Sequence, residues 1–137
     1  MWIPMGKPEA IARISGGKEA PCLFGTVKFY NMGKNVMVVV DISGLPDNDS
    51  GFYAFHIHDA EGHYDPGGKP HPLRAGDLPP LISCDGRAFF VVLSNRFALC
   101  QICGKTAVIH RKADDFTSQP SGNPGPMIGT GTIRQCL

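Results

Sequence analysis

Short segments in which apolar and polar residues alternate run through most of the chain. They are rich in β-branched and aromatic residues and end at glycine, asparagine or other turn residues, which is typical of β-strands. In one of them, Leu23, Val27 and Phe29 alternate with residues that would face the other way. The pattern predicts strands over residues 10–16, 22–31, 35–44, 51–59, 86–95, 106–112 and 129–135.

Residues 97–104 are ambiguous, with a short strand as one possibility, and no segment keeps a helical period for more than a turn or two. Residues 59–83 and 114–128 are rich in proline, and we expect two long loops there, which are usually functional or disordered. Strands at this spacing predict an all-β antiparallel sandwich or barrel. The length of 137 residues indicates a single domain over residues 1–137, with 1–9 as an N-terminal tail.

The composition excludes several classes of partner. Hydrophobic residues make up 42% of the chain, charged residues 18%, and the net charge is only +1, so no general attraction to nucleic acid or to a membrane is expected. The longest apolar run, residues 36–40, is too short to cross a bilayer. The first ten residues show no basic leader followed by an apolar run. We expect a soluble, cytoplasmic protein.

The cysteine pattern gives a weaker signal. The chain has 5 cysteines, so at least one thiol stays free unless it pairs between chains. Cys100 and Cys103 form a C-x-x-C, which could be half of a zinc site or a redox pair. No second C-x-x-C is present in the sequence, and no strand–cysteine–helix pattern surrounds this one. We therefore expect reduced thiols in an apolar segment.

The histidines give the strongest chemical signal. Four of the 5 lie within residues 51–77. In a strand, His56 and His58 project from one face, while Phe55 and Ile57 point the other way, toward a core. A single H-x-H is often only a solvated strand face.

The remaining candidates make a metal site the better interpretation. His63 follows after a short turn, and His71 and Asp77 lie in the first long loop. A neighbouring strand would contribute His110, and Asp114 just beyond it can accept hydrogen bonds from imidazole N–H groups. An all-nitrogen set suits Cu(II), whereas a carboxylate that joins histidines suits zinc.

Five sequence motifs carry a resemblance to a known family. In order along the chain they are GFYAFHIHD, GHYDP, H-x-x-x-x-G-D, GKTAVIHRKADDF and GNPG. Together they resemble the copper–zinc superoxide dismutases, from about residue 10 to residue 133. The resemblance implies an eight-stranded antiparallel Greek-key sandwich or flattened barrel with two long functional loops. It also implies an antioxidant oxidoreductase that converts superoxide to oxygen and hydrogen peroxide with a redox-active copper.

The resemblance also implies roles for the site residues. The copper ligands would be His56, His58, His63 and His110. The zinc ligands would be His63, His71 and Asp77. His63 would bridge the two metals and deliver protons in catalysis, and Asp114 would link His56 to His71.

One departure from the family pattern concerns zinc. Arg74 stands where the family has a third zinc histidine, and a guanidinium has no lone pair for a metal. Zinc would then have His63, His71 and Asp77 with a water, or Arg74 would pair with Asp77 and leave the zinc pocket empty. We expect copper with weak or absent zinc.

Two other departures concern the dimer and the substrate. Only DAEG separates His58 from His63, so the family's loop cysteine is missing, and Thr130 replaces its disulfide partner. The usual dimer is therefore doubtful, and the oligomeric state stays open. Met127 occupies the position of the arginine that guides the superoxide anion, and residues 114–128 contain no lysine or arginine. Anion steering should be weak, unless Arg74 supplies a replacement charge.

Three functions are compatible with these residues. The first is a copper-dependent superoxide dismutase of reduced efficiency, whose small-molecule substrate is superoxide. The second is a non-catalytic dismutase-like domain that stores or relays copper, which Met127 and the short loop favour. The third is a cupin-like enzyme that uses H-x-H with Glu61, but HRKADDF matches the dismutase pattern better.

Overall fold

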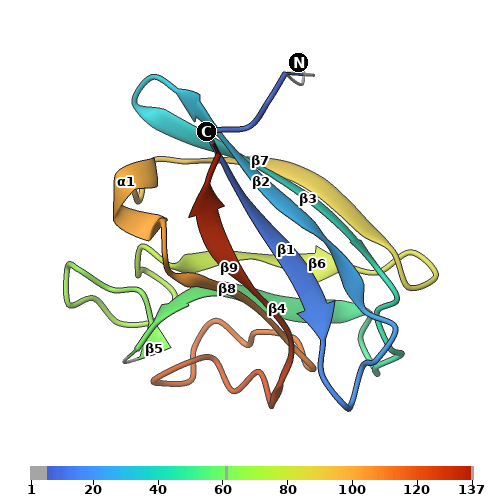
Figure 1. Ribbon diagram of the computed structural model, residues 1–137. Coiled ribbons are helices and arrows are strands. Elements are labelled where there is room, and N and C mark those ends of the chain that lie inside the picture. The colour runs from blue at the N-terminus through green and yellow to red at the C-terminus, as the bar shows by residue number, and fades with distance from the viewer. Residues whose placement is uncertain (1–5, 61, 137) are drawn as a thin grey trace.

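The computed structural model describes residues 6–60 and 62–136, and over these residues the chain forms one curled antiparallel sheet (Figure 1). Eight of its strands have at least five residues, and β5 has two. The strands are β1 (Ala10–Gly16), β2 (Phe24–Met32), β3 (Asn35–Ser43), β4 (Phe52–Asp59), β5 (Gly62–His63), β6 (Asp77–Ile82), β7 (Ala88–Ser94), β8 (Thr106–His110) and β9 (Met127–Gln135). A single helical turn, α1 (Leu99–Ile102), follows β7.

The order of the strands confirms the predicted fold class. The long strands lie in the order β6-β4-β8-β9-β1-β2-β3-β7, with the short β5 beside the end of β4. Every strand pair is antiparallel. Because β4 pairs with β6 and β8 rather than with β3, and β9 returns beside β1, the connections are those of a Greek key.

All seven strands expected from the alternating pattern are present, with ends that differ by at most two residues. The assignment of residues 97–104 as a possible strand is wrong, because they contain α1. Leu99 and Ile102 are both buried there, and their spacing of three residues suits one helical turn against the core. The backbone N–H of Ala98 donates to Gln101 Oε1 at 2.8 Å, which closes the start of this turn.

The expectation that residues 59–83 form one loop is also wrong, because this segment contains β5 and β6. Pro79 and Pro80 made β6 look like part of a loop in the sequence, because proline lacks the N–H that a central strand needs. The structure places β6 at an edge, where only β4 pairs with it. Because consecutive residues of a strand face opposite sides, one proline nitrogen faces outward, where no ladder hydrogen bond forms. Both prolines lie where the pairing with β4 changes register, between Tyr53 and Phe55.

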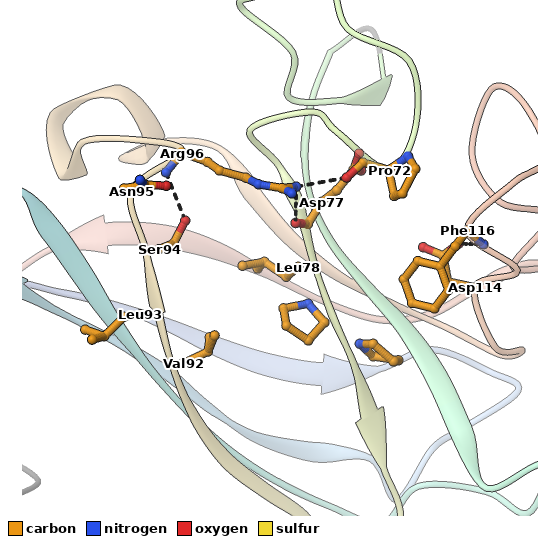
Figure 2. A pocket seen from close by; sticks show the side chains of 12 residues that line it. Pro72, Asp77, Leu78, Val92, Leu93, Ser94, Asn95, Arg96, Asp114 and Phe116 are labelled. Carbon is orange, nitrogen blue, oxygen red and sulfur yellow. Dashed lines mark hydrogen bonds between the residues drawn. The ribbon is translucent and has the colours of Figure 1, made fainter. Parts of the chain in front are cut away.

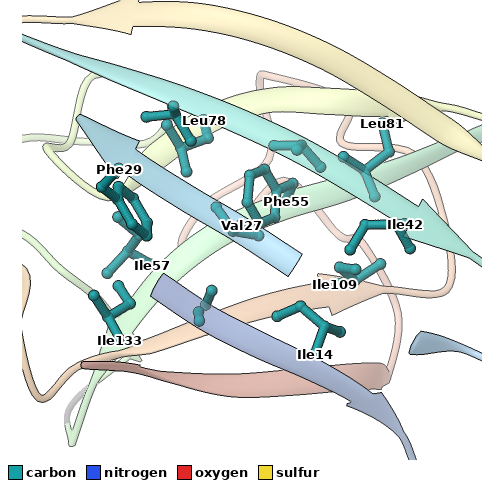
Figure 3. Packing of buried hydrophobic residues seen from close by; sticks show 14 of the residues in the cluster. Ile14, Val27, Phe29, Ile42, Phe55, Ile57, Leu78, Leu81, Ile109 and Ile133 are labelled. Carbon is teal, nitrogen blue, oxygen red and sulfur yellow. The ribbon is translucent and has the colours of Figure 1, made fainter. Parts of the chain in front are cut away.

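The core forms on the inner face of the curled sheet (Figure 3). Phe55 and Ile57 of β4 and Ile109 of β8 are fully buried there, together with Val27 and Phe29 of β2. Alternation along β4 therefore sends its histidines to the opposite face. That face is covered by the segments between β4 and β6 and between β8 and β9.

Some expectations fall outside what the structure describes. Residues 1–5 of the expected tail and Glu61 of the cupin alternative lie outside the described residues. The assignment of residues 1–137 to a single domain stays a prediction. In the described part of the chain, no helix has the length and apolar character needed to cross a bilayer.

The packing of β8 against β4 gives a stability prediction. Ile109 is fully buried and lies opposite Phe55, so Ile109→Ala should lower the free energy of unfolding by about 2–5 kcal/mol. Ile82→Ala removes the same atoms from a side chain that is 63% exposed and should change it by less than about 0.5 kcal/mol. Urea unfolding of the metal-free proteins measures both, and equal losses would contradict this description of the core.

Candidate metal centre

Neighbouring strands bring three imidazoles onto one face of the sheet. His56 and His58 are two residues apart in β4, so their side chains project together. Ile109 of β8 lies opposite Phe55, and both point into the core, so the next residue, His110, projects on the side of His56. The ring centre of His110 lies 5.3 Å from that of His56 and 5.5 Å from that of His58.

The short turn after β4 adds a fourth imidazole. The pairing of β5 with β4 places His63 opposite His58. Its ring centre is 3.9 Å from that of His56 and 4.8 Å from that of His58. The four histidines of the predicted copper site each offer a nitrogen atom, and these atoms lie within 4.8 Å of one another.

The nitrogen atoms that converge have no hydrogen bonds. His56 Nδ1 and the Nε2 atoms of His58, His63 and His110 are buried without a partner among the described residues. In three of these rings the other nitrogen does have one, because His56 Nε2 lies 3.0 Å from Asp114 Oδ2, His63 Nδ1 lies 2.8 Å from Asp77 Oδ1 and His110 Nδ1 lies 3.0 Å from the Gly125 carbonyl oxygen. An N–H that donates to each oxygen leaves a lone pair on the converging nitrogen. Four buried lone pairs without partners are costly unless they bind a cation, so this donor set fits copper.

Burial favours the neutral form of three of these rings, those of His56, His58 and His110. The pKa of His56 is lowered to about 3 and that of His58 to about 4, mainly by burial and secondly by the neighbouring His63. Burial also lowers the pKa of His110, although its bond to the Gly125 carbonyl opposes the shift. Neutral imidazoles are the form that binds metals, so near pH 7 these rings are ready for one.

A second group of donors lies behind His63. Asp77 Oδ1 is 2.8 Å from His63 Nδ1 and 3.2 Å from His71 Nδ1. All three residues are buried, and together with His56 their ligand atoms lie within 4.8 Å of one another. Burial by itself would raise the pKa of Asp77, but hydrogen bonds from His63 and from the Arg74 backbone N–H lower it. The carboxylate is therefore ionised, and the three predicted zinc ligands converge.

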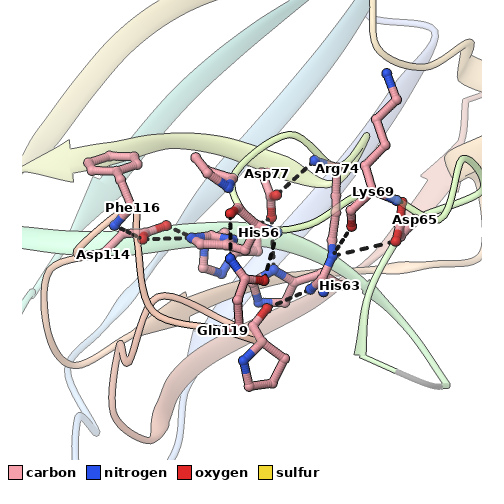
Figure 4. A network of polar contacts seen from close by, with 12 residues as sticks. His56, His63, Asp65, Lys69, Arg74, Asp77, Asp114, Phe116 and Gln119 are labelled. Atoms are coloured by element: carbon pink, nitrogen blue, oxygen red, sulfur yellow. Dashed lines mark hydrogen bonds and ion pairs between the residues drawn. The ribbon is translucent and has the colours of Figure 1, made fainter.

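Arg74 does not form the expected ion pair with Asp77, which was one of the two alternatives for the zinc pocket. Its backbone N–H donates to Asp77 Oδ2 at 3.0 Å, but its guanidinium turns away from that carboxylate (Figure 4). Nε donates to the Lys69 carbonyl oxygen at 2.9 Å, and Nη1 donates to the Pro120 carbonyl oxygen at 2.6 Å. Nε also lies 3.5 Å from Asp65 Oδ2. The idea that Arg74 and Asp77 form an ion pair is therefore wrong, because Asp65 and two carbonyl groups hold the guanidinium elsewhere.

Asp114 joins the two donor groups. Its Oδ2 lies 3.0 Å from His56 Nε2, and its Oδ1 lies 2.7 Å from His71 Nε2. Burial would raise the pKa of this carboxyl, but hydrogen bonds from His71, His56 and the Phe116 backbone N–H lower it. One ionised carboxylate thus fixes the tautomer of an imidazole in each group.

Three further residues support the site, and the sequence pattern did not indicate them. Gln119 accepts from the His71 backbone N–H at 3.1 Å and donates to its carbonyl oxygen at 2.8 Å. Arg96 Nη1 donates to the carbonyl oxygens of Pro72, Arg74 and Asp77 at 2.9, 3.2 and 3.3 Å (Figure 2). These contacts join residues at least 19 positions apart, and no local motif reports such contacts.

Gly122 is the third of these residues. Its φ of +81° favours glycine, and an added Cβ would overlap Asp114 Oδ1 and lie 2.6 Å from His71 Nε2. The sequence predicted only that this glycine lies in a long loop. In the structure it also leaves room for the bond between Asp114 and His71.

Met127 opens β9 opposite His110 and is 57% exposed. Its thioether carries no charge, so it cannot attract an anion to the neighbouring imidazole. All five cysteines lie in the described residues, and none of them forms a disulfide.

Comparisons with known proteins agree with this arrangement. The family model "Copper/zinc superoxide dismutase" matches residues 23–133. The protein called superoxide dismutase [Cu-Zn] 2 of Aquifex aeolicus is 31% identical over 138 residues, which cover 82% of this chain and 80% of the relative. The superoxide dismutase [Cu-Zn] of Legionella pneumophila is 30% identical over 132 residues, which cover 83% of this chain and 80% of that protein.

A solved structure supports the fold alone. It is a double mutant of a SOD-like protein from Bacillus subtilis, with a TM-score of 0.77 and 24% sequence identity. The match covers 90% of this chain and 96% of the other.

The crowding at Gly122 yields a mutational prediction. Gly122→Ala should push the Asp114 carboxylate off His71 and lower copper affinity about 10- to 100-fold, as loss of such supporting contacts usually does. Gly68→Ala is the matched control, because Gly68 has φ +63° but no atom within 4 Å of an added Cβ. Competition with a copper chelator measures the affinities, and a similar loss in both variants would point to backbone strain alone.

The lowered histidine pKa values predict acid sensitivity of the metal-free protein. The unfolded chain binds protons at His56 and His58 near pH 6.5, whereas the folded chain does so only near 3 and 4. Because the unfolded state then holds more protons, the free energy of unfolding should fall as pH drops from 7 to 5, by about 2 kcal/mol or more. Urea unfolding at pH 7, 6 and 5 tests this. A flat profile would mean that these rings titrate normally in the folded protein.

Proposed function

The chain belongs to the copper/zinc superoxide dismutase family, and we propose that it is a copper-dependent enzyme that converts superoxide to oxygen and hydrogen peroxide. The observation that carries this proposal is the convergence of four buried imidazole nitrogens without hydrogen-bond partners. When bound there, copper would supply one-electron redox chemistry, and the protein would supply its binding and electrostatics.

The residues of this chain would divide the work. His56 would bind copper through Nδ1, and His58, His63 and His110 through Nε2, the atoms left without partners. Asp114, Asp77 and the Gly125 carbonyl keep the opposite nitrogens protonated. His63 would be the catalytic proton carrier, because its single lone pair at Nε2 can hold either the metal or a proton, in turn, while its Nδ1–H remains on Asp77.

We propose that zinc binds weakly or not at all. The second donor group among the described residues contains His63, His71, Asp77 and His56, but His56 Nε2 is already bonded to Asp114. That leaves three donors for zinc, whereas structural zinc sites use four protein ligands. The position that the resemblance assigns to a third histidine is Arg74, whose fixed positive charge opposes a second cation. Asp77 already holds His63 Nδ1 at 2.8 Å, so the imidazole is oriented without zinc.

The second candidate is a domain that stores or relays copper without turnover. The uncharged Met127 beside His110 favours it, as does the absence of lysine and arginine from residues 114–128. The cytoplasmic location stays a prediction. The doubt about the usual family dimer also stays a prediction, and its supporting sequence features are Thr130 and the short DAEG segment between His58 and His63.

Metal content and activity together test these proposals. We expect the purified protein to take up about one copper per chain and clearly less zinc, and to consume superoxide faster than the same concentration of copper salt. Tight zinc binding equal to that of copper would contradict the zinc proposal. Activity no higher than that of free copper would leave storage or relay as the function.

A pair of variants tests the ligand assignment. His110→Ala removes one of the four unpaired nitrogens and should lower copper affinity at least about 100-fold, because the metal loses a ligand. Cys103→Ala changes a thiol that is not part of the donor groups and should leave the affinity within about twofold of the unchanged protein. Equal affinities in the two variants would show that copper binds elsewhere.

A further inference from the structure

A cavity opens over the predicted copper site. Its volume is about 420 Å³, and three of the imidazoles with unpaired Nε2 atoms line it, those of His58, His63 and His110. The other lining residues come from the end of β4, from β5 and from the two long connections, which join β5 to β6 and β8 to β9. They are Asp59, Gly62, Asp65, Arg74, Pro120 and Ser121. A small molecule in this cavity would therefore lie beside the three imidazoles whose buried Nε2 atoms would hold the copper.

Arg74 is the one lysine or arginine among the lining residues that the structure describes. Residues 114–128, which form the opposite wall, contain no basic residue at all. Met127, at the end of that segment, is uncharged. Any attraction that this cavity exerts on an anion through a basic side chain must therefore come from Arg74.

The guanidinium of Arg74 is held in a fixed position (Figure 4). Its bonds to the carbonyl oxygens of Lys69 and Pro120 tie it to both long connections, and the side chain is only 17% exposed. Nη2 has no hydrogen-bond partner among the described residues, so two N–H donors remain available. A donor group that is already immobilised loses little side-chain entropy when it binds a ligand.

Two carboxylates limit the strength of this positive charge. Asp65 Oδ2 lies 3.5 Å from Arg74 Nε, and Asp59 lines the same cavity. The Asp65 carboxylate also accepts from the Lys69 backbone N–H at 2.9 Å, which shares its negative charge with a second donor. Arg74 (+1) and the two carboxylates (−2) leave the lining with a formal charge of −1. A monoanion would therefore be held by the direct contacts of Arg74 and by the metal rather than by the net field, which opposes highly charged anions most.

We propose that Arg74 forms the cationic wall of an anion-binding cavity and, through Nη2, binds and orients small monoanions that reach the copper. This proposal rests on the proposed function, because the copper would be the second contact of the anion. It assigns to a residue of the first long connection the task that the family gives to the position of Met127.

Azide binding to the copper(II)-loaded protein tests the proposal without turnover. Azide is a small monoanion, and its coordination to copper(II) is followed by optical absorption. Arg74→Gln should weaken azide binding about three- to tenfold, the range of one partly screened charge contact, and should reduce its salt dependence. Arg74→Lys keeps the charge but loses the planar guanidinium. Its azide affinity should lie between that of the unchanged protein and that of Arg74→Gln.

Lys69→Gln is the matched control, because it removes the same charge from the same connection. The amine of Lys69 points away from His63 (Figure 4), so azide affinity should stay within about twofold of the unchanged protein. Copper content and the electron paramagnetic resonance spectrum of each variant show whether the metal site is intact. If Arg74→Gln does not bind copper, the comparison of Arg74→Lys with the unchanged protein tests the proposal, and the azide affinity of Arg74→Lys should still be lower.

The outcomes separate this proposal from the proposed function. If every variant holds copper and azide affinity is the same in Arg74→Gln and Lys69→Gln, the role of Arg74 is refuted and the copper site stands. If the unchanged protein binds no copper, the proposed function and the role of Arg74 fail together.

Discussion

The buried carboxylate of Asp114 is the contact on which the rest of the site depends. It accepts hydrogen bonds from His56 of strand β4 and from His71 of the connection between β5 and β6. It therefore joins the sheet to the segment that covers it. Because the carboxylate is ionised and accepts from both rings, the opposite nitrogen of each ring keeps its lone pair. Loss of this contact would leave His56 and His71 free to rotate or to change tautomer.

Polar side chains hold the covering connections in place. The Gln119 side chain both accepts from and donates to the backbone of His71. Arg96 donates to the carbonyl oxygens of Pro72 and Arg74 in the same connection and of Asp77 at the start of β6. Arg74 adds bonds to two further carbonyl groups, one from each connection. Such satisfied polar networks give a loop a defined conformation, so these contacts help to bring the donor atoms together.

The sequence predicted the strands well because side chains in a strand alternate with a period that is local and easy to read. It failed at β6, since Pro79 and Pro80 argue against any strand until its edge position is known. The same logic holds at the site. The spacing of His56 and His58 indicates a shared face, whereas the direction of the Arg74 guanidinium and the space beside Gly122 depend on contacts between distant segments.

The two edges of the sheet differ in their capacity to accept another strand. At β6, Pro79 and Pro80 both lack an N–H, and because consecutive residues face opposite sides, one of them removes a donor that an incoming chain would need. At β7, seven residues without proline or charged side chains present an uninterrupted edge. A further strand should therefore add to the sheet at β7 rather than at β6, because β6 has fewer N–H groups to pair with it.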